Sequence, residues 1–297
     1  MYIPHETRPT EDRDAFLRSC IRTFLLSFFA LDFIESCMKL TLSDPAGSSI
    51  FLPTLSPLPR YALSTFLHTC TGLAFIAGFN MVYYLLAFLF IRFLNHSPTS
   101  WPPIFDSPWY SESLHDYWSK RWHQLLRQTF LTSGGYPAEY LTRHVVGFFG
   151  GPKLANLASK IALVLGTFAA SGFFHSLALY AMGGEKGTSN DVTLFFVLQG
   201  VAVIGERVWR NVTGRRVGGW IGMTWTYAVI LLGGQRCSTY KFPSSPLSLP
   251  DTYNNCLTVN AMHERGLGGG MVIPPPISPT RLFLFPMLTR VVESLSH

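Results

Sequence analysis

The stretch IALVLGTFAASGFFHSLALYAM, residues 161–182, decides the fold class of this chain. It contains no Lys, Arg, Asp or Glu. It also meets the length of about 20 residues that an α-helix needs to cross the hydrocarbon core of a bilayer. His175 lies within it, and ionisable groups at that depth usually face a cavity, a partner or a substrate path because they are costly in lipid. The stretch therefore predicts an integral membrane protein with a polar site inside it.

The composition indicates the same class. Charged residues make up 13% of the 297 residues, against roughly 25% in soluble domains. Aromatic residues reach 14%, and many of the seven Trp stand near the ends of apolar runs, where interfacial rings belong. The five Cys are scattered without zinc spacing, which predicts packing residues and no metal site. We expect an all-α, polytopic helical bundle whose partner is the lipid bilayer and not a nucleic acid.

Five apolar runs are candidates for membrane spans. Asp32 and Glu35 interrupt the far end of the first run, and the second is read as one long, tilted helix. The chain beyond the fifth run is rich in Pro and Gly, so residues 237–297 are expected to form an irregular tail. The whole chain, residues 1–297, is predicted to be a single membrane domain. The predicted spans are residues 16–34, 61–94, 161–182, 192–209 and 218–235.

Positive charge gives this topology an orientation. With five spans, fifteen basic residues lie on the side of the N-terminus and only five lie on the other. Because cytoplasmic loops carry an excess of Lys and Arg, the N-terminus and the loop of residues 95–160 are predicted to be cytoplasmic. The fifteen are Arg8, Arg13, Arg18, Arg22, Arg92, Lys120, Arg121, Arg127, Arg143, Lys153, Lys160, Arg207, Arg210, Arg215 and Arg216.

The centre of that loop reads LHDYWSKRWHQLLRQTF, residues 114–130. Trp118, Trp122 and the pair at 125–126 recur at helical spacing, which predicts a basic amphipathic helix resting at the membrane interface. A second interpretation is that the basic side chains here receive an anionic cytosolic ligand, such as the phosphates of a nucleotide cofactor.

Residues 118–127, WSKRWHQLLR, resemble the W-x-x-R-W-H-x-x-x-R signature of the wax synthase branch of the membrane-bound O-acyltransferases, the fungal members above all. His123 matches the first histidine of that superfamily, and His175 in SGFFH matches the second, intramembrane one. Residues 206–225 are similar to the closing segment of the branch. The resemblance covers about residues 101–232. Its members carry more N-terminal spans than the two found here, so we expect a short form or an incomplete sequence.

The resemblance implies acyl transfer from an acyl-CoA co-substrate to a hydroxyl, without a permanently bound cofactor, in the endoplasmic reticulum membrane. His175 would be the general base, because a neutral imidazole suits that task, and His123 would orient the acyl group or stabilise the oxyanion. Trp118 and Trp122 would belong to the substrate site. Lys120, Arg121 and Arg127 would meet the CoA phosphates.

Within this reading, we expect acetyl transfer to a hydrophobic secondary metabolite such as a terpenoid, with a long-chain wax ester synthase as the alternative. A small transporter, or a truncated relative without catalysis, stays open as a different class. Ser171 lies one turn before His175, so a Ser–His nucleophile is conceivable, although packing by a small residue is the simpler interpretation. Glu206 and Arg207 are expected to snorkel to the interface or to pair across helices.

Overall fold

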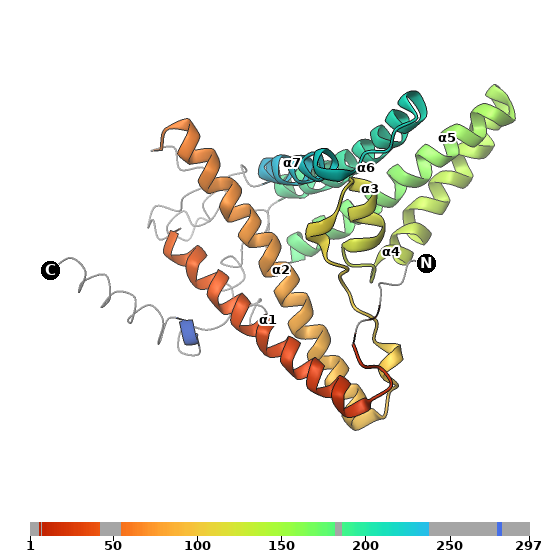
Figure 1. Ribbon diagram of the computed structural model, residues 1–297. Coiled ribbons are helices and arrows are strands. Elements are labelled where there is room, and N and C mark those ends of the chain that lie inside the picture. Colours follow the sequence, from red (N-terminus) through yellow and green to blue (C-terminus); the bar gives the residue numbers. More distant parts are fainter. Residues whose placement is uncertain (1–5, 7, 42–54, 182–185, 238–277, 281–297) are drawn as a thin grey trace. The chain divides into compact units, whose positions relative to one another are not determined.

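The computed structural model describes residues 6, 8–41, 55–181, 186–237 and 278–280. These residues fall into two compact units, 103–237 and 6–102 with 278–280. Every regular element in the described ranges is a helix, which confirms the all-α prediction (Figure 1).

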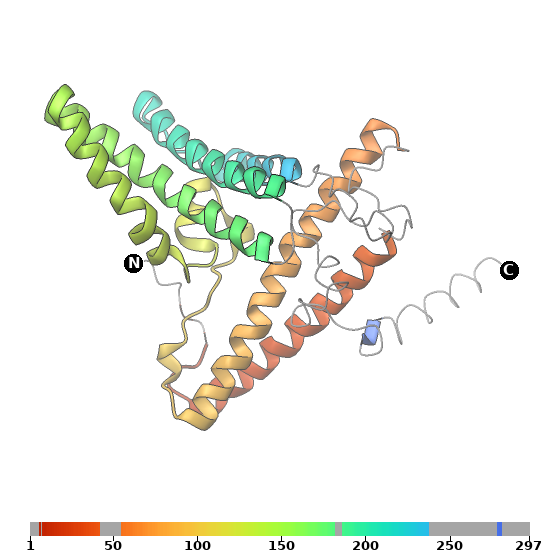
Figure 2. The ribbon, with the colours of Figure 1, turned by 180° about the vertical axis from the view of Figure 1, so that it is seen from behind.

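The unit that contains residues 6–102 is a helical hairpin. Helix α1 (Arg13–Thr41) and helix α2 (Pro57–Leu94) lie side by side and antiparallel (Figures 1 and 2). Proline at the first position of α2 lacks only an N–H that would have no helical partner there. Asn95 ends α2 in the left-handed region at φ 57°, and its N–H donates to the Phe90 carbonyl. The short 3₁₀ turn Pro98–Ser100 follows.

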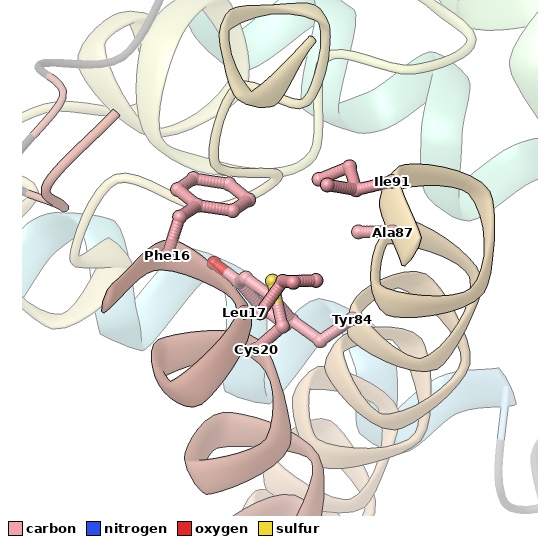
Figure 3. Packing of buried hydrophobic residues seen from close by; sticks show 6 residues of the cluster. All are labelled: Phe16, Leu17, Cys20, Tyr84, Ala87 and Ile91. Atoms are coloured by element: carbon pink, nitrogen blue, oxygen red, sulfur yellow. The ribbon is translucent and has the colours of Figure 1, made fainter. Parts of the chain in front are cut away.

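The two helices of the hairpin are joined by buried apolar contacts. Figure 3 shows one such cluster, in which residues near the start of α1 meet residues near the end of α2. Cys20 is fully buried in this cluster, so it is a packing residue as predicted. The cluster consists of Phe16, Leu17, Cys20, Tyr84, Ala87 and Ile91.

The two acidic residues that interrupt the first predicted span are buried in this unit. Asp32 is 1% exposed, and its Oδ2 accepts a hydrogen bond from the backbone N–H of Thr280 at 2.8 Å. The hydroxyl of Ser36 is 3.3 Å from that of Ser278. Part of the predicted tail therefore contacts α1, while the rest of residues 237–297 lies outside the described residues, apart from Cys237 at the end of α7.

The unit of residues 103–237 is built on three longer helices: α5 (Tyr136–Ala181), α6 (Lys186–Thr213) and α7 (Gly219–Cys237). Helix α5 is broken at Gly151, whose φ of 74° and ψ of 173° are not helical, and Pro152 follows. Its two arms fold back on each other, as both ribbon views show (Figures 1 and 2). The arms are thus antiparallel neighbours, and the predicted span 161–182 belongs to the second arm.

Small residues let the π turn that leads into the first arm approach the second arm closely. A Cβ on Gly134 would lie 2.3 Å from the Gly166 carbonyl oxygen, and a Cβ on Gly166 would lie 2.5 Å from that of Gly134. The same pattern of small residues is common where helices pack in membranes, because it brings the backbones into van der Waals contact. The contact fixes the register of the first arm against the second.

Residues 114–130 do not form the continuous helix that was predicted. Helix α3 (Leu114–Asp116) leads into a π-helical turn, Tyr117–Arg121, and the chain is then irregular until helix α4 (Arg127–Phe130). The side-chain amide of Gln124 donates to the carbonyls of Trp122 at 2.6 Å and of Trp118 at 3.4 Å. Those carbonyls are therefore bonded by a side chain in place of a helical N–H. A second π turn, Leu131–Gly135, joins α4 to α5.

Three helical stretches in the described part of the chain are long and apolar enough to cross a membrane: Pro57–Leu94, Arg127–Ala178 and Asp191–Thr213. They contain most of the predicted spans 61–94, 161–182 and 192–209. Helices α1 and α7, which hold the other two predicted spans, are not among them. The count of five spans, the single membrane domain and the orientation stay predictions.

The close contact at Gly166 leads to a stability prediction. We expect Gly166→Ala to lower the free energy of unfolding by about 1–3 kcal/mol, because its Cβ would press on the Gly134 backbone. The matched control is Gly205→Ala on α6, where no atom lies within 4 Å of the added Cβ. It should stabilise the protein by roughly 0.5–1 kcal/mol through helix propensity. Thermal unfolding in detergent measures both, and equal shifts would contradict the close packing of the arms.

Candidate active site

His175 lies on the second arm of α5, with one ring nitrogen bonded and the other available. Its Nδ1 is 2.7 Å from the backbone carbonyl oxygen of Ser171. A carbonyl only accepts, so Nδ1 carries a proton and donates it; in the neutral ring, Nε2 then keeps its lone pair. The link between Ser171 and His175 runs through the backbone and not through the hydroxyl, which favours the packing interpretation of Ser171.

Aromatic rings surround His175 from two other elements. Phe196 on α6 stacks on the imidazole with ring centroids 4.5 Å apart. Phe130, at the end of α4, lies 6.3 Å away, and Phe174 lies 5.8 Å away, edge on. The imidazole is thus held in an apolar environment, where water competes weakly for its nitrogen.

Trp118 of the signature segment (residues 114–127) packs against the same two helices. Its ring centroid lies 5.9 Å from that of Phe196 and 5.8 Å from that of Phe168. Its indole N–H donates to the side-chain oxygen of Gln199 at 3.2 Å, and Gln199 is 1% exposed. A buried indole that finds a hydrogen-bond partner has a fixed orientation. Trp118 therefore faces the interior of its unit and not the membrane interface.

His123 lies in the irregular stretch between Arg121 and Arg127. Its ring is 5.7 Å from that of Trp122 and 6.2 Å from that of Phe105. Burial, and to a smaller extent the nearby His175, lower the pKa of His123 to about 4. His123 is therefore a neutral imidazole at pH 7. His175 contributes to this shift, so the two histidines of the predicted site interact electrostatically in the fold.

The predicted phosphate-binding residues have different surroundings. The Nε of Arg121 donates to Oδ2 of Asp116 at 2.5 Å, and its Nη1 donates to two backbone carbonyls at 3.3 Å, those of Asp106 and Ser107. Arg121 thus fixes the backbone of the segment. Lys120 pairs with Oδ1 of Asp116 at 3.4 Å but keeps 47% of its side chain exposed. Arg127, at the start of α4, is partly exposed.

Glu206 pairs across helices, as one of the two expectations had it, but its bonds to α3 were not indicated by the sequence. Its Oε1 accepts hydrogen bonds from the Leu114 N–H at 2.8 Å and the Trp225 indole N–H at 3.1 Å. Its Oε2 accepts the His115 N–H at 3.0 Å. Glu206 is 9% exposed, so it does not snorkel. Its seven-residue spacing from Gln199, which places both on one face of α6, was the signal that could have revealed it.

Two further hydrogen bonds join the residues just before the signature segment to α7. The Tyr227 hydroxyl donates to the Pro108 carbonyl at 3.0 Å. The Gly219 N–H donates to Oε2 of Glu112 at 3.1 Å. A Cβ on Gly222 would lie 2.1 Å from the Glu112 carbonyl oxygen, so a glycine is needed where α7 meets this segment. In the part of the chain that the structure describes, no group of three or more His, Cys, Asp and Glu is placed to hold a metal ion.

Comparison with known proteins finds relatives that are similar to the same region. Residues 101–198 match the membrane bound O-acyl transferase family. The chain is 29% identical over 151 residues to the acetyltransferase aurG of Calcarisporium arbuscula, covering 50% of this chain and 34% of that protein. It is 31% identical over 169 residues to the acetyltransferase atnC of an Arthrinium species, covering 54% of this chain and 36% of that protein.

A plant protein is also similar: the probable long-chain-alcohol O-fatty-acyltransferase 1 of Arabidopsis thaliana, at 30% identity over 104 residues, covering 35% of this chain and 28% of that protein. The chain therefore spans about a third of the length of these curated relatives. No solved structure matches it.

The pKa of His123 leads to a prediction about acid stability. Its folded pKa of about 4 lies below the value of about 6.5 in an unfolded chain. The unfolded state therefore binds more protons as the pH falls, and the native state loses stability between about pH 6.5 and 4. Relative to His123→Gln, the wild type should lose about 2 kcal/mol more between pH 8 and pH 5. Melting temperatures in detergent across this range measure the difference, and parallel curves for the two proteins would contradict it.

Proposed function

This chain belongs to the membrane-bound O-acyltransferase family, in its wax synthase-like branch, and from that premise we propose that it transfers an acyl group from acyl-CoA to the hydroxyl of a hydrophobic acceptor. The observation that carries the proposal is the state of His175. Its Nδ1 donates to the Ser171 carbonyl, so Nε2 is the proton acceptor among apolar rings. A general base needs that nitrogen free.

In the proposed reaction, Nε2 of His175 removes the proton of the acceptor hydroxyl as its oxygen attacks the thioester carbonyl carbon. A C–O bond forms, and the carbonyl oxygen takes the negative charge. The N–H of a neutral His123 donates a hydrogen bond to that oxyanion. The C–S bond then breaks, and the CoA thiolate leaves with the proton that His175 took up. The product is the ester.

The phosphates of CoA would meet cations at the start of the signature segment. Lys120 remains half exposed although it pairs with Asp116, and the adjoining Arg207 on α6 is exposed. The pKa of His115 is lowered mainly by burial, while Glu206 raises it. The charges of Lys120 and Arg207 both lower the pKa of His115 further, so both cations act on the same part of the segment. We assign the phosphates to Lys120 and Arg207 with Arg127. Arg121 would hold the segment that presents them.

For the donor, we propose acetyl-CoA, and for the acceptor a secondary metabolite such as a terpenoid. Two fungal relatives are named acetyltransferases, which supports the acetyl donor. The similarity to a probable long-chain-alcohol O-fatty-acyltransferase supports the alternative, a wax ester synthase. Trp118 and Trp122 would line the acyl site in either case. We place the protein in the endoplasmic reticulum membrane with its N-terminus in the cytoplasm, as the basic residues suggest.

We further propose that the first arm of α5, with the residues just before it, dips into the bilayer beside the second arm. Gly134 contacts Gly166, and Phe130 contacts Phe174, deep in the predicted span. On the exposed face, the Thr132 hydroxyl donates to the Gln128 carbonyl at 2.9 Å and the Ser133 hydroxyl to that of Thr129 at 2.7 Å. Such bonds satisfy hydroxyls that water does not reach.

Acyl transfer by membranes that contain this chain tests the function. Labelled acetyl-CoA and palmitoyl-CoA are offered with terpenoid, sterol and fatty-alcohol acceptors. We expect His175→Ala to lower the rate about 10²–10⁴-fold, the usual contribution of general-base catalysis. His144→Ala is the matched control, because the exposed His144 also has its Nδ1 bonded to a carbonyl four residues earlier, at 2.8 Å.

Transfer from acetyl-CoA that only His175→Ala abolishes would support the acetyltransferase. Transfer from palmitoyl-CoA alone would favour the wax ester synthase. No transfer from folded protein would favour a non-catalytic relative or a small transporter, and equal rates in the wild type and His175→Ala would remove His175 as the base.

Cysteine labelling tests the depth of the first arm. In a cysteine-free background, Ser133→Cys and Arg215→Cys are treated in intact microsomes with a membrane-impermeant maleimide. Both parent residues are exposed on the protein surface. We expect Arg215→Cys to react at once and Ser133→Cys to react only after detergent is added. If both react equally in intact microsomes, residues 127–150 belong to a water-exposed loop, as the sequence first suggested.

A further inference from the structure

Glu206 joins three parts of the chain through one buried carboxylate. It lies on α6, its two oxygens accept the first two backbone N–H groups of α3, and one of them also accepts the indole N–H of Trp225 on α7. Figures 1 and 2 show α3 next to these two helices. The partners of this carboxylate are thus all N–H donors from elements that precede or follow α6 in sequence.

These contacts provide acceptors for the first backbone N–H groups of the signature segment. The first N–H groups of a helix have no partner within it. Here those of Leu114 and His115 donate to Glu206, and that of Asp116 donates to the Ser113 hydroxyl at 3.0 Å. Leu114 is fully buried, so water cannot replace a lost acceptor at its N–H. Hydrogen bonds to an ionised carboxylate are about twice as strong as neutral ones.

Contacts along one face of α6 link the Glu206 carboxylate to the region of the two histidines. The segment is bonded to one face of α6 at two points: at its start to Glu206, and at Trp118 to Gln199, seven residues earlier on the helix. Phe196, on the same face, stacks on His175. A shift of the segment along α6 would therefore move Trp118 and His123 relative to His175.

We infer that Glu206 is a positioning residue, which fixes the signature segment along α6 so that His123 and Trp118 face His175. Glu206 itself does not contact any of the three rings in the described structure. This inference rests on the proposed acyl transfer for its kinetic consequence, but its structural part stands on the three hydrogen bonds alone.

The test uses Glu206→Gln, which keeps the size of the side chain but offers one acceptor oxygen in place of two. At least one backbone N–H of α3 then loses its acceptor. We expect amide hydrogen exchange in residues 113–122 to accelerate at least tenfold, with exchange in α2 unchanged. We expect kcat to fall by about 100-fold, the effect of roughly 1 Å of misplacement, with the KM for acyl-CoA nearly unchanged.

Two further variants separate positioning from a general loss of stability. Trp225→Phe removes a single donor to Glu206 and leaves both backbone contacts, so its effects on exchange and kcat should be smaller than those of Glu206→Gln. Glu139→Gln changes a carboxylate that pairs with Arg143 on the surface of α5, and it should change neither quantity.

Faster exchange confined to residues 113–122 supports the inference. Unchanged exchange there overturns it, and so does acceleration spread equally over α2 and α6, which would indicate general unfolding. If Glu206→Gln does not fold, Trp225→Phe decides by the same criterion. If the wild type transfers no acyl group, the proposed function fails, while the exchange measurement still decides the role of Glu206.

Discussion

Backbone N–H groups buried among apolar helices must find acceptors, and much of the arrangement of residues 103–237 depends on how this requirement is met at Glu206. A carboxylate is costly to bury unless hydrogen bonds compensate for the lost water. Three N–H donors compensate here, and they come from α3 and α7. The same residue thus makes its own burial possible and holds an irregular segment against α6.

The signature segment needs contacts from other elements because it has little regular structure of its own. It contains a three-residue helix, a π turn and an irregular stretch, and π turns are frequent at functional sites. Its side chains take over the bonds that a regular helix would make: Gln124 to the carbonyls of Trp118 and Trp122, and Arg121 to Asp116 and two carbonyls. The outcome is that Trp118 turns inward, against α5, which carries His175, and against α6.

Sequence reasoning predicted the parts of this site that local pattern determines. His175 was visible as an ionisable residue in an apolar stretch, and the signature segment singled out His123 and Trp118. The helix predicted for residues 114–130 was wrong as a continuous element, because helical spacing of Trp and Leu does not reveal a Gln124 side chain that bonds the backbone. The break at Gly151-Pro152 could be read in the sequence, since proline interrupts helices. The antiparallel contact of the arms that follows it could not.

Long-range contacts account for most of what the sequence did not predict. Glu206 and Leu114 are 92 residues apart, and Asp32 and Thr280 are 248 apart. In both pairs an acidic residue on an apolar helix bonds a backbone N–H that no pattern in the sequence marks. Arg121 was assigned to a phosphate by its place in the signature segment, and in the fold its Nε and Nη1 donate within the protein. Charge alone does not distinguish these two uses.

The central claim is that His175 presents an unprotonated Nε2 to the site. Nitrogen-15 NMR of the imidazole, in protein labelled at histidine and reconstituted in lipid, measures this directly, with His175→Gln to assign the signal. The account predicts the neutral tautomer that is protonated at Nδ1, in keeping with the bond to the Ser171 carbonyl. A proton on Nε2 at pH 7, in the other tautomer or in the imidazolium, would contradict it.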